Sequence, residues 1–175
     1  MKMLRGIYPS LVGLLLGSLQ TGLYFQLSFT LSSSFRTFLL VTVCWLIGSV
    51  IGIGIAKQAR LPLNSLLVLA IAMYFACAAL LGTAPFNTEL WPVYALFIVV
   101  SGLYPGVFFV RLNQYYRAQI LFFRENNGFI AGIVIGTLLF LVAGRPALWF
   151  IPLLLAGMVF ACSQHLASSD RVVKS

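Results

Sequence analysis

Six long apolar stretches are the feature that most limits how this chain can fold. A helix that crosses about 30 Å of hydrocarbon needs about 20 mostly apolar residues. The chain offers six stretches of nearly this length or more, at residues 7–31, 38–56, 63–82, 91–110, 128–144 and 146–163. The sequence therefore predicts an all-α integral membrane protein, with a six-helix transmembrane domain over residues 1–163 and a short polar tail over residues 164–175.

The composition excludes an ordinary soluble domain. Of the 175 residues, 61% are hydrophobic and 8% are charged, whereas soluble domains average about 45–50% apolar and about 25% charged residues. The net charge of +8 is scattered between apolar runs, so we expect no nucleic-acid partner. The expected partners are the lipid bilayer and either other membrane subunits or further copies of this chain.

The basic residues predict the orientation, because positive residues in short loops favour the cytoplasmic face. With the N-terminus inside, nine of them lie at cytoplasmic ends and two, Arg36 and Arg145, on the far side. The nine are Lys2, Arg5, Lys57, Arg60, Arg111, Arg117, Arg124, Arg171 and Lys174. We therefore expect both termini in the cytoplasm and the protein in the cytoplasmic (inner) membrane of a bacterium.

The connection between the fourth and fifth stretches predicts an amphipathic helix in the cytoplasmic interface. At 100° per residue, its apolar side chains lie within about 80° of one another; they are Leu112, Tyr116, Ile120 and Phe123. The alternative is a simple extension of the fourth span. The residues expected to bind anionic headgroups or a partner here are Arg111, Tyr116, Arg117, Arg124 and Glu125.

Small residues recur at every fourth position on three stretches, and such ridges let helix backbones approach closely in lipid. They are Gly13, Gly17 and Thr21, then Gly48, Gly52 and Ala56, then Gly128, Gly132 and Gly136. These ridges predict either packing within one bundle or docking onto a helix of a partner.

Few polar residues lie inside the apolar stretches. Gln20 and Tyr24 share one face of the first, and Gln26 lies well away from that face. Together with a helix break predicted at Pro105 and Gly106, Gln20 and Tyr24 form a candidate substrate cavity, although hydrogen bonds between helices explain them equally well. No ionisable residue is expected at mid-span, which counts against ion-coupled transport by this chain alone.

The sequence offers little chemistry for catalysis. His165 is the only histidine, and the three cysteines lie inside apolar runs without a C-x-x-C pair. No nucleophile motif, metal-binding motif or phosphate-binding glycine loop is present. We therefore expect no catalytic residues, no cofactor, no metal and no enzymatic activity.

Three glycine-containing motifs carry a resemblance to a known family. They are Gly48, Gly52 and Gly54, then Gly102 with Pro105, then Asn126 or Asn127 with Gly128 and Gly132. The second has one residue fewer than the family's G-x-x-x-P step, and the third is shifted in register. With these differences, the chain resembles the membrane region of spermidine-synthase-like membrane proteins, which is akin to half of a major-facilitator transporter. The resemblance implies a transporter-like helical fold without the aminopropyltransferase domain, and it does not imply polyamine synthesis.

Two functional hypotheses follow. The first is a non-catalytic accessory or anchoring subunit that docks a partner or lipid through its glycine ridges and basic interfacial segment. The alternative is a small-molecule carrier, either a half-transporter that dimerises or a substrate-binding membrane component. An enzyme working at the membrane surface is disfavoured because no nucleophile or acid–base pair is evident.

Overall fold

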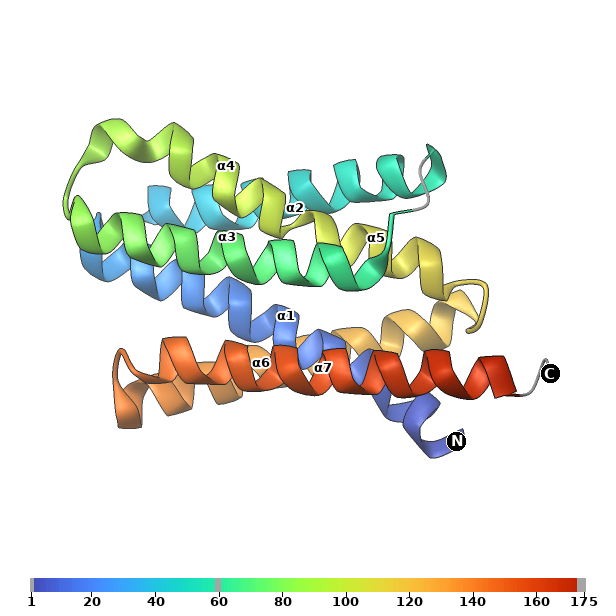
Figure 1. Ribbon diagram of the computed structural model, residues 1–175. Coiled ribbons are helices and arrows are strands. Elements are labelled where there is room, and N and C mark those ends of the chain that lie inside the picture. Colours follow the sequence, from blue (N-terminus) through green and yellow to red (C-terminus); the bar gives the residue numbers. More distant parts are fainter. Residues whose placement is uncertain (1, 59–60, 173–175) are drawn as a thin grey trace. The chain divides into compact units, whose positions relative to one another are not determined.

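The computed structural model describes the backbone of residues 2–58 and 61–172, and the side chains of residues 6–58 and 61–166. These residues form helices joined by short loops, without strands (Figure 1). Its helices are α1 (Lys2–Thr30), α2 (Phe35–Gln58), α3 (Leu63–Thr83), a short 3-10 turn (Thr88–Leu90), α4 (Trp91–Ser101), α5 (Leu103–Leu112), α6 (Ala118–Ala143) and α7 (Ala147–Val172).

The described residues include six helical stretches long and apolar enough to cross a membrane, with α4 and α5 together forming the fourth. The prediction of an all-α membrane protein with six spans is therefore confirmed. The predicted side of each terminus stays a prediction. Of the basic residues that it used, Arg60, Lys174 and the side chains of Lys2, Arg5 and Arg171 lie outside the described residues.

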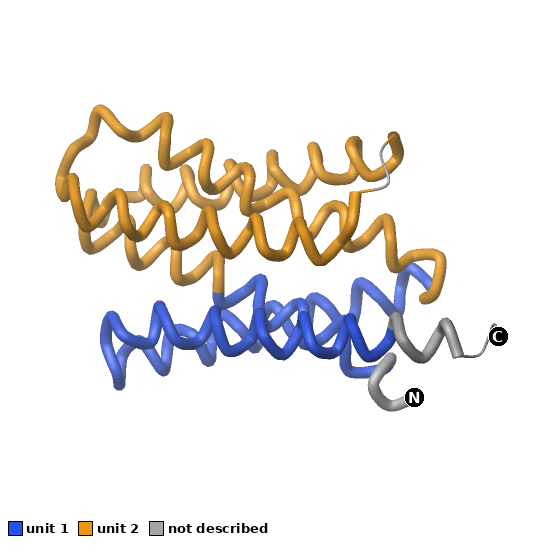
Figure 2. The backbone as a smooth tube through the Cα atoms, viewed as in Figure 1, with its two compact units in different colours: residues 1–18, 117–175 blue, residues 19–116 orange. Residues whose placement is uncertain are grey.

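The chain divides into two compact units (Figure 2). Unit 1 comprises Met1–Ser18 and Arg117–Ser175, and unit 2 comprises Leu19–Tyr116. Unit 1 therefore contains the first half of α1 with α6 and α7, whereas unit 2 contains the second half of α1 with α2 to α5.

In unit 1, α6 runs parallel to α1. Gly128 lies against Ser10 and Gly132 against Leu14, so both positions advance together along the two helices. A tight turn then joins α6 to α7. Gly144 adopts a positive φ of 70° there, a conformation that glycine tolerates without steric cost.

In unit 2, α2 packs against α4 and α5, and α3 packs against the same two helices. Gly102 lies against Trp45 and Gly106 against Ser49, so α2 runs parallel to the fourth span. Each unit thus contains a pair of parallel helices. Because successive spans cross a membrane in opposite directions, spans one and five must be parallel to each other, and so must spans two and four.

The fourth span breaks at Gly102, between α4 and α5, and not at Pro105 and Gly106 as predicted. Pro105 has no amide hydrogen to donate to the Ser101 carbonyl, and its ring crowds that carbonyl, so the disturbance appears one turn earlier. Pro9 and Pro152 lie inside uninterrupted helices, so proline alone does not break a helix here. We therefore attribute the break to Pro105 and Gly102 together.

The fifth span begins at Ala118, ten residues before the predicted Gly128, and runs without interruption to Ala143. A separate interfacial helix is therefore not formed. Leu112 ends α5, which extends the fourth span, and residues 118–127 are the first turns of α6. The physical reason is local: no proline or glycine separates Ala118 from Gly128, and Arg and Glu are good helix formers.

Candidate functional site

The glycine ridges of spans one and five pack against each other inside unit 1. A Cβ added at Gly13 would overlap the Glu125 carbonyl and lie 2.8 Å from the Phe129 nitrogen. On the other helix, a Cβ added at Gly128 would lie 2.8 Å from the Ser10 carbonyl carbon. Gly17 and Gly132 are equally crowded, Gly136 is looser, and Thr21 is buried.

The ridge of span two packs in the same way inside unit 2. Gly48 and Gly52 lie against the backbone of Val99 and Leu103, and Ala56 is half-buried. A Cβ added at Gly106 would lie 2.8 Å from the Ile53 nitrogen. The space beside Gly106 is therefore occupied by the backbone of α2, and the role of Pro105 and Gly106 in a substrate cavity stays a prediction.

In the ridges of spans one and two, a serine follows one glycine and bonds to both helices of its pair. The Ser18 hydroxyl lies 2.9 Å from the Leu14 carbonyl oxygen and 3.5 Å from that of Gly132. The Ser49 hydroxyl lies 3.0 Å from the Trp45 carbonyl oxygen and 3.2 Å from that of Gly102. Sequence analysis missed these residues, although the Gly-Ser pair was a visible signal.

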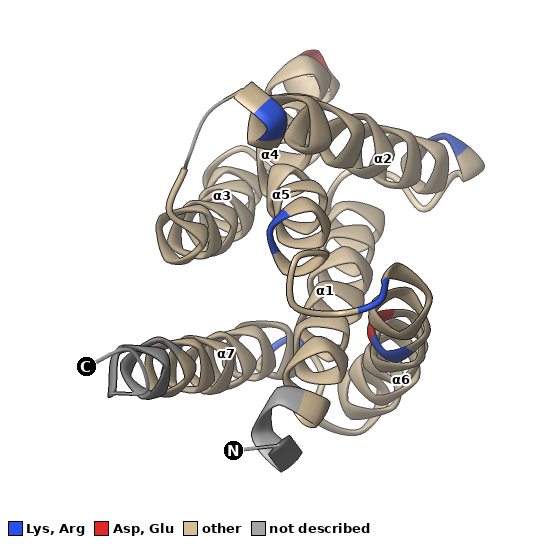
Figure 3. Cartoon of the chain, turned by 90° about the vertical axis from the view of Figure 1, so that its right-hand side faces the viewer, with Lys and Arg blue, Asp and Glu red and all other residues tan. Residues whose placement is uncertain are grey.

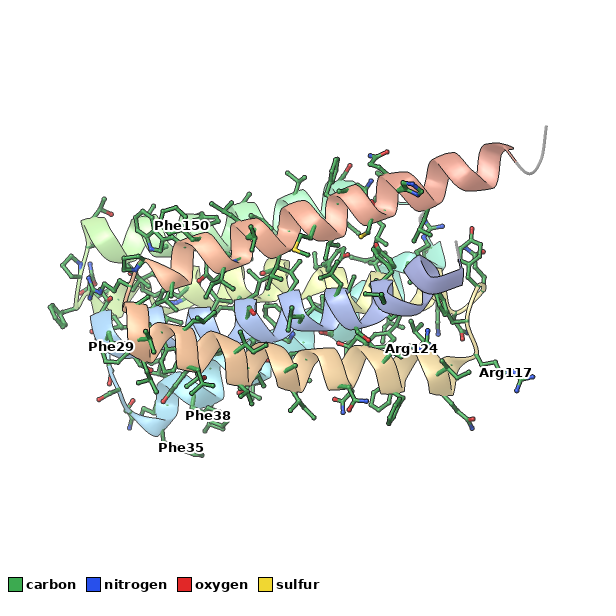
Figure 4. All side chains as sticks on the ribbon, turned by 90° about the horizontal axis from the view of Figure 1, so that it is seen from below. Phe29, Phe35, Phe38, Arg117, Arg124 and Phe150 are labelled. Atoms are coloured by element: carbon green, nitrogen blue, oxygen red, sulfur yellow. The ribbon has the colours of Figure 1, made fainter. Side chains whose placement is uncertain are left out.

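Arg124 and Glu125 lie within α6 rather than before it. The Arg124 Nη1 donates a hydrogen bond to the Gly6 carbonyl at 2.8 Å, and Figure 4 shows this side chain directed toward α1. Glu125 is 7% exposed. Among the described residues no ion pair joins Glu125 to an arginine, and Arg111 instead donates to the Leu61 carbonyl at 3.3 Å.

The first turns of α6 expose the apolar side chains that were predicted to form one face of an interfacial helix. Ile120, Phe122 and Phe123 are 45%, 60% and 67% exposed, whereas Leu121 and Glu125 are buried against the protein. In lipid, apolar side chains face outward, and ionisable ones turn toward the bundle and its backbone carbonyls. This explains why these turns of α6 expose apolar side chains and bury Glu125, the reverse of a helix at an aqueous surface.

Basic residues lie on α5 and at the beginning of α6 (Figure 3). Arg117 is exposed and precedes α6 in an extended conformation, with ψ of 131°. Its side chain extends away from the helices in Figure 4. Tyr116 is half-buried, one residue earlier. Of the predicted interfacial residues, Arg117 is thus the basic residue that is most available to a ligand.

A line of polar side chains runs through the interior of unit 2, between α3 and α4. The Ser101 hydroxyl donates to the Ala70 carbonyl at 3.2 Å, which fixes the register of these antiparallel helices. Cys77 lies seven residues after Ala70 on α3, and Tyr94 lies seven residues before Ser101 on α4. The antiparallel register therefore brings Cys77 close to Tyr94. All four residues are fully buried, and so is Tyr74 between them.

The second half of α1 closes this interior. A Cβ added at Gly22 would lie 3.0 Å from the Tyr74 ring, so glycine makes room for the phenol. Gln26 follows Gly22 by one turn on the same face of α1 and is 8% exposed. We call Gln26, Tyr74 and Tyr94 the polar seam.

The polar seam contains atoms without hydrogen-bond partners. Among the described residues, neither the Nε2 nor the Oε1 of Gln26 has a partner, and the Tyr94 hydroxyl also has none. The predicted cavity residues Gln20 and Tyr24 are only half-buried, and Tyr24 packs edge-on against Phe38 with ring centroids 6.0 Å apart. The residue of α1 that reaches the interior is therefore Gln26, which hydropathy alone could not distinguish from Gln20.

The described part of the chain contains no group of three or more His, Cys, Asp or Glu residues able to hold a metal ion. His165 is exposed, and Cys44 and Cys77 are buried thiols. Comparison of the chain with protein-family models, with curated proteins and with solved structures finds no match.

Proposed function

We propose that this protein is a non-catalytic accessory or anchoring membrane subunit that holds an anionic lipid headgroup at the beginning of α6. The observation that carries the proposal is the exposed set Arg117, Ile120, Phe122 and Phe123, which we call the α6 docking face. It combines one available cation with three large apolar side chains that lie within about one turn of α6.

The side chains of the α6 docking face suit the boundary between hydrocarbon and lipid headgroups. Aromatic rings are favoured at the boundary between hydrocarbon and headgroups. An arginine near an anionic membrane surface contributes about 1 kcal/mol of attraction. The positive end of the helix dipole points the same way. The glycine ridges take no part, because each is filled by a helix of the same chain.

Native mass spectrometry of the protein released from nanodiscs would test this proposal. Nanodiscs containing phosphatidylglycerol and phosphatidylcholine should leave phosphatidylglycerol on the wild-type protein, and R117A should retain less of it. The matched control is R145A, because Arg145 is also exposed but belongs to the predicted far side. Equal retention by R117A and wild type would refute lipid docking. Loss of a co-purifying protein instead of lipid would assign this face to a partner.

The alternative of a small-molecule carrier is supported by one specific observation. The polar seam lies beside α4, which ends at the break at Gly102, and broken helices often mark substrate sites in transporters. The transporter-like fold implied by the resemblance to spermidine-synthase-like membrane proteins would agree with this alternative. A cysteine at Ile98, which is fully buried on α4, would then react with a small membrane-impermeant thiol reagent. Complete protection of I98C in a background lacking the three native cysteines would argue against a carrier.

A further inference from the structure

We propose that the polar seam of unit 2 binds a buried water molecule between Gln26, Tyr74 and Tyr94. This inference is independent of lipid docking at α6, because it concerns a different unit and different residues. It assigns a ligand to three side chains that come from α1, α3 and α4.

The polar seam contains several buried polar atoms that need a hydrogen-bond partner. Both amide atoms of Gln26 and the hydroxyl of Tyr94 are buried and have no hydrogen-bond partner among the described residues. An amide or hydroxyl that is buried without a hydrogen bond is unfavourable. Bulk water cannot supply the bond in a membrane interior.

The residues of the polar seam are neighbours. Gly22 of α1 lies against the Tyr74 hydroxyl, and Gln26 follows Gly22 by one turn, as Cys77 follows Tyr74 by one turn on α3. Independently, the Ser101–Ala70 hydrogen bond sets an α3–α4 register that brings Tyr94 to Cys77, one turn from Tyr74. The buried polar groups of Gln26 and Tyr94 therefore lie in one part of the interior of unit 2, next to Tyr74.

The chemistry of the ligand follows from the polar groups that surround it. The side chains of the seam are uncharged, so an ionic ligand would lie in an apolar interior without a counter-charge. Gln26 offers both donors and an acceptor, and each tyrosine hydroxyl offers both. A molecule with two donors and two acceptors satisfies this set, and buried waters typically make about three such bonds.

The size of the ligand follows from the crowding around Tyr74. Its ring fits only because position 22 has no Cβ, since a Cβ there would lie 3.0 Å from ring carbons and closer still to the hydroxyl. Large solutes have no place beside such a contact. Water is the smallest molecule with the required donors and acceptors.

Radiolytic hydroxyl-radical labelling of the full chain in nanodiscs would test the site. Radicals formed from a bound water oxidise the side chains next to it, even where bulk solvent cannot reach. Tyr74 and Tyr94 should label several-fold faster than Phe108, a fully buried aromatic residue of the same unit. Labelling of both tyrosines at the rate of Phe108 would overturn the proposal, and this comparison needs no variant.

A pair of substitutions then assigns the water to Gln26. Q26L keeps the approximate volume but removes all the amide hydrogen bonds, so labelling of Tyr74 and Tyr94 should fall to the rate of Phe108. Q20L is the matched control, because Gln20 is a half-buried glutamine of the same helix, and labelling should persist. Unchanged labelling in a folded Q26L protein would overturn the role of Gln26.

Discussion

The Ser49 hydroxyl lies 3.2 Å from the carbonyl oxygen of Gly102, the residue at which the fourth span breaks. In a continuous helix, the amide of Gly106 would be the partner of that carbonyl. Gly106 itself lies against the backbone of α2. The serine therefore supplies a hydrogen bond where the helix geometry is disturbed, and α2 stabilises the break from the side.

Replacing Ser49 by alanine should destabilise unit 2. The variant loses the bond to Gly102, and side-chain hydrogen bonds between membrane helices are worth about 0.6 kcal/mol on average. The free energy of unfolding in mixed micelles, followed by circular dichroism, should fall by this order. S65A is the control, since Ser65 is exposed on α3. Equal free energies of unfolding for S49A and S65A would show that the Ser49 hydroxyl does not stabilise the break at Gly102.

Alanine at Gly13 should destabilise unit 1 by about 1–3 kcal/mol, the range for overpacking a filled interior. Its Cβ would meet the backbone of Glu125 and Phe129. The matched control is G157A, because a Cβ at this helical position meets nothing within 4 Å. There alanine should stabilise the helix by up to about 1 kcal/mol through its higher propensity. Thermal unfolding of the two variants in one detergent compares the effects, and opposite signs are expected.

Glutamine at position 124 should weaken unit 1, whereas glutamine at position 117 should not. Arg124 donates to the Gly6 carbonyl at 2.8 Å, and hydrogen bonds to charged groups are worth about 1.5–3 kcal/mol. Arg124 is only partly buried, so we expect a loss near or below about 1 kcal/mol after screening by solvent. The unfolding midpoints of R124Q and R117Q in detergent measure the difference. A larger loss for R117Q would contradict the structure.

Alanine at position 105 should strengthen the backbone around the break. It restores an amide hydrogen that can reach the Ser101 carbonyl. Hydrogen exchange of the peptide that covers residues 101–106, measured by mass spectrometry, should become slower. P152A is the control, since Pro152 lies in the uninterrupted α7 and its replacement should leave residues 101–106 unchanged. Unaltered exchange in P105A would assign the break to Gly102 alone.

Cysteines at the two ends of unit 2 should report the predicted orientation. Ser33, between α1 and α2, and Gln114, after α5, are both exposed. In a background without native cysteines, S33C should react with an impermeant maleimide added outside intact cells. Q114C should react only after the cells are opened. The reverse pattern would place both termini on the outside.

The number and type of spans could be predicted because they depend on local composition. A run of about 20 apolar residues must be helical in lipid, since each backbone group has to find its partner within the segment. The glycine spacing likewise showed that close helix pairs form. It did not show that Gly13 and Gly17 meet the helix of Gly128 and Gly132, because pairing depends on contacts distant in sequence.

The basic connection shows where local reasoning failed. Its helical wheel separated Arg124 and Glu125 correctly from Ile120 and Phe123, but assigned the charged face to water. The fold turns that face toward α1, where a backbone carbonyl accepts the Arg124 hydrogen bond. A wheel gives the two faces of a helix, but not the solvent that each one meets.

The all-helical character and the six spans follow from the residues of each segment, because hydrophobic length and helix formation are local properties. Three features depend instead on the packing of the helices: the break of the fourth span at Gly102, the filling of the glycine ridges by helices of the same chain, and the burial of Gln26 rather than Gln20. Each of these depends on which helix lies opposite. Close packing against that neighbour selects one face of each helix, and the pattern of a single segment does not contain this information.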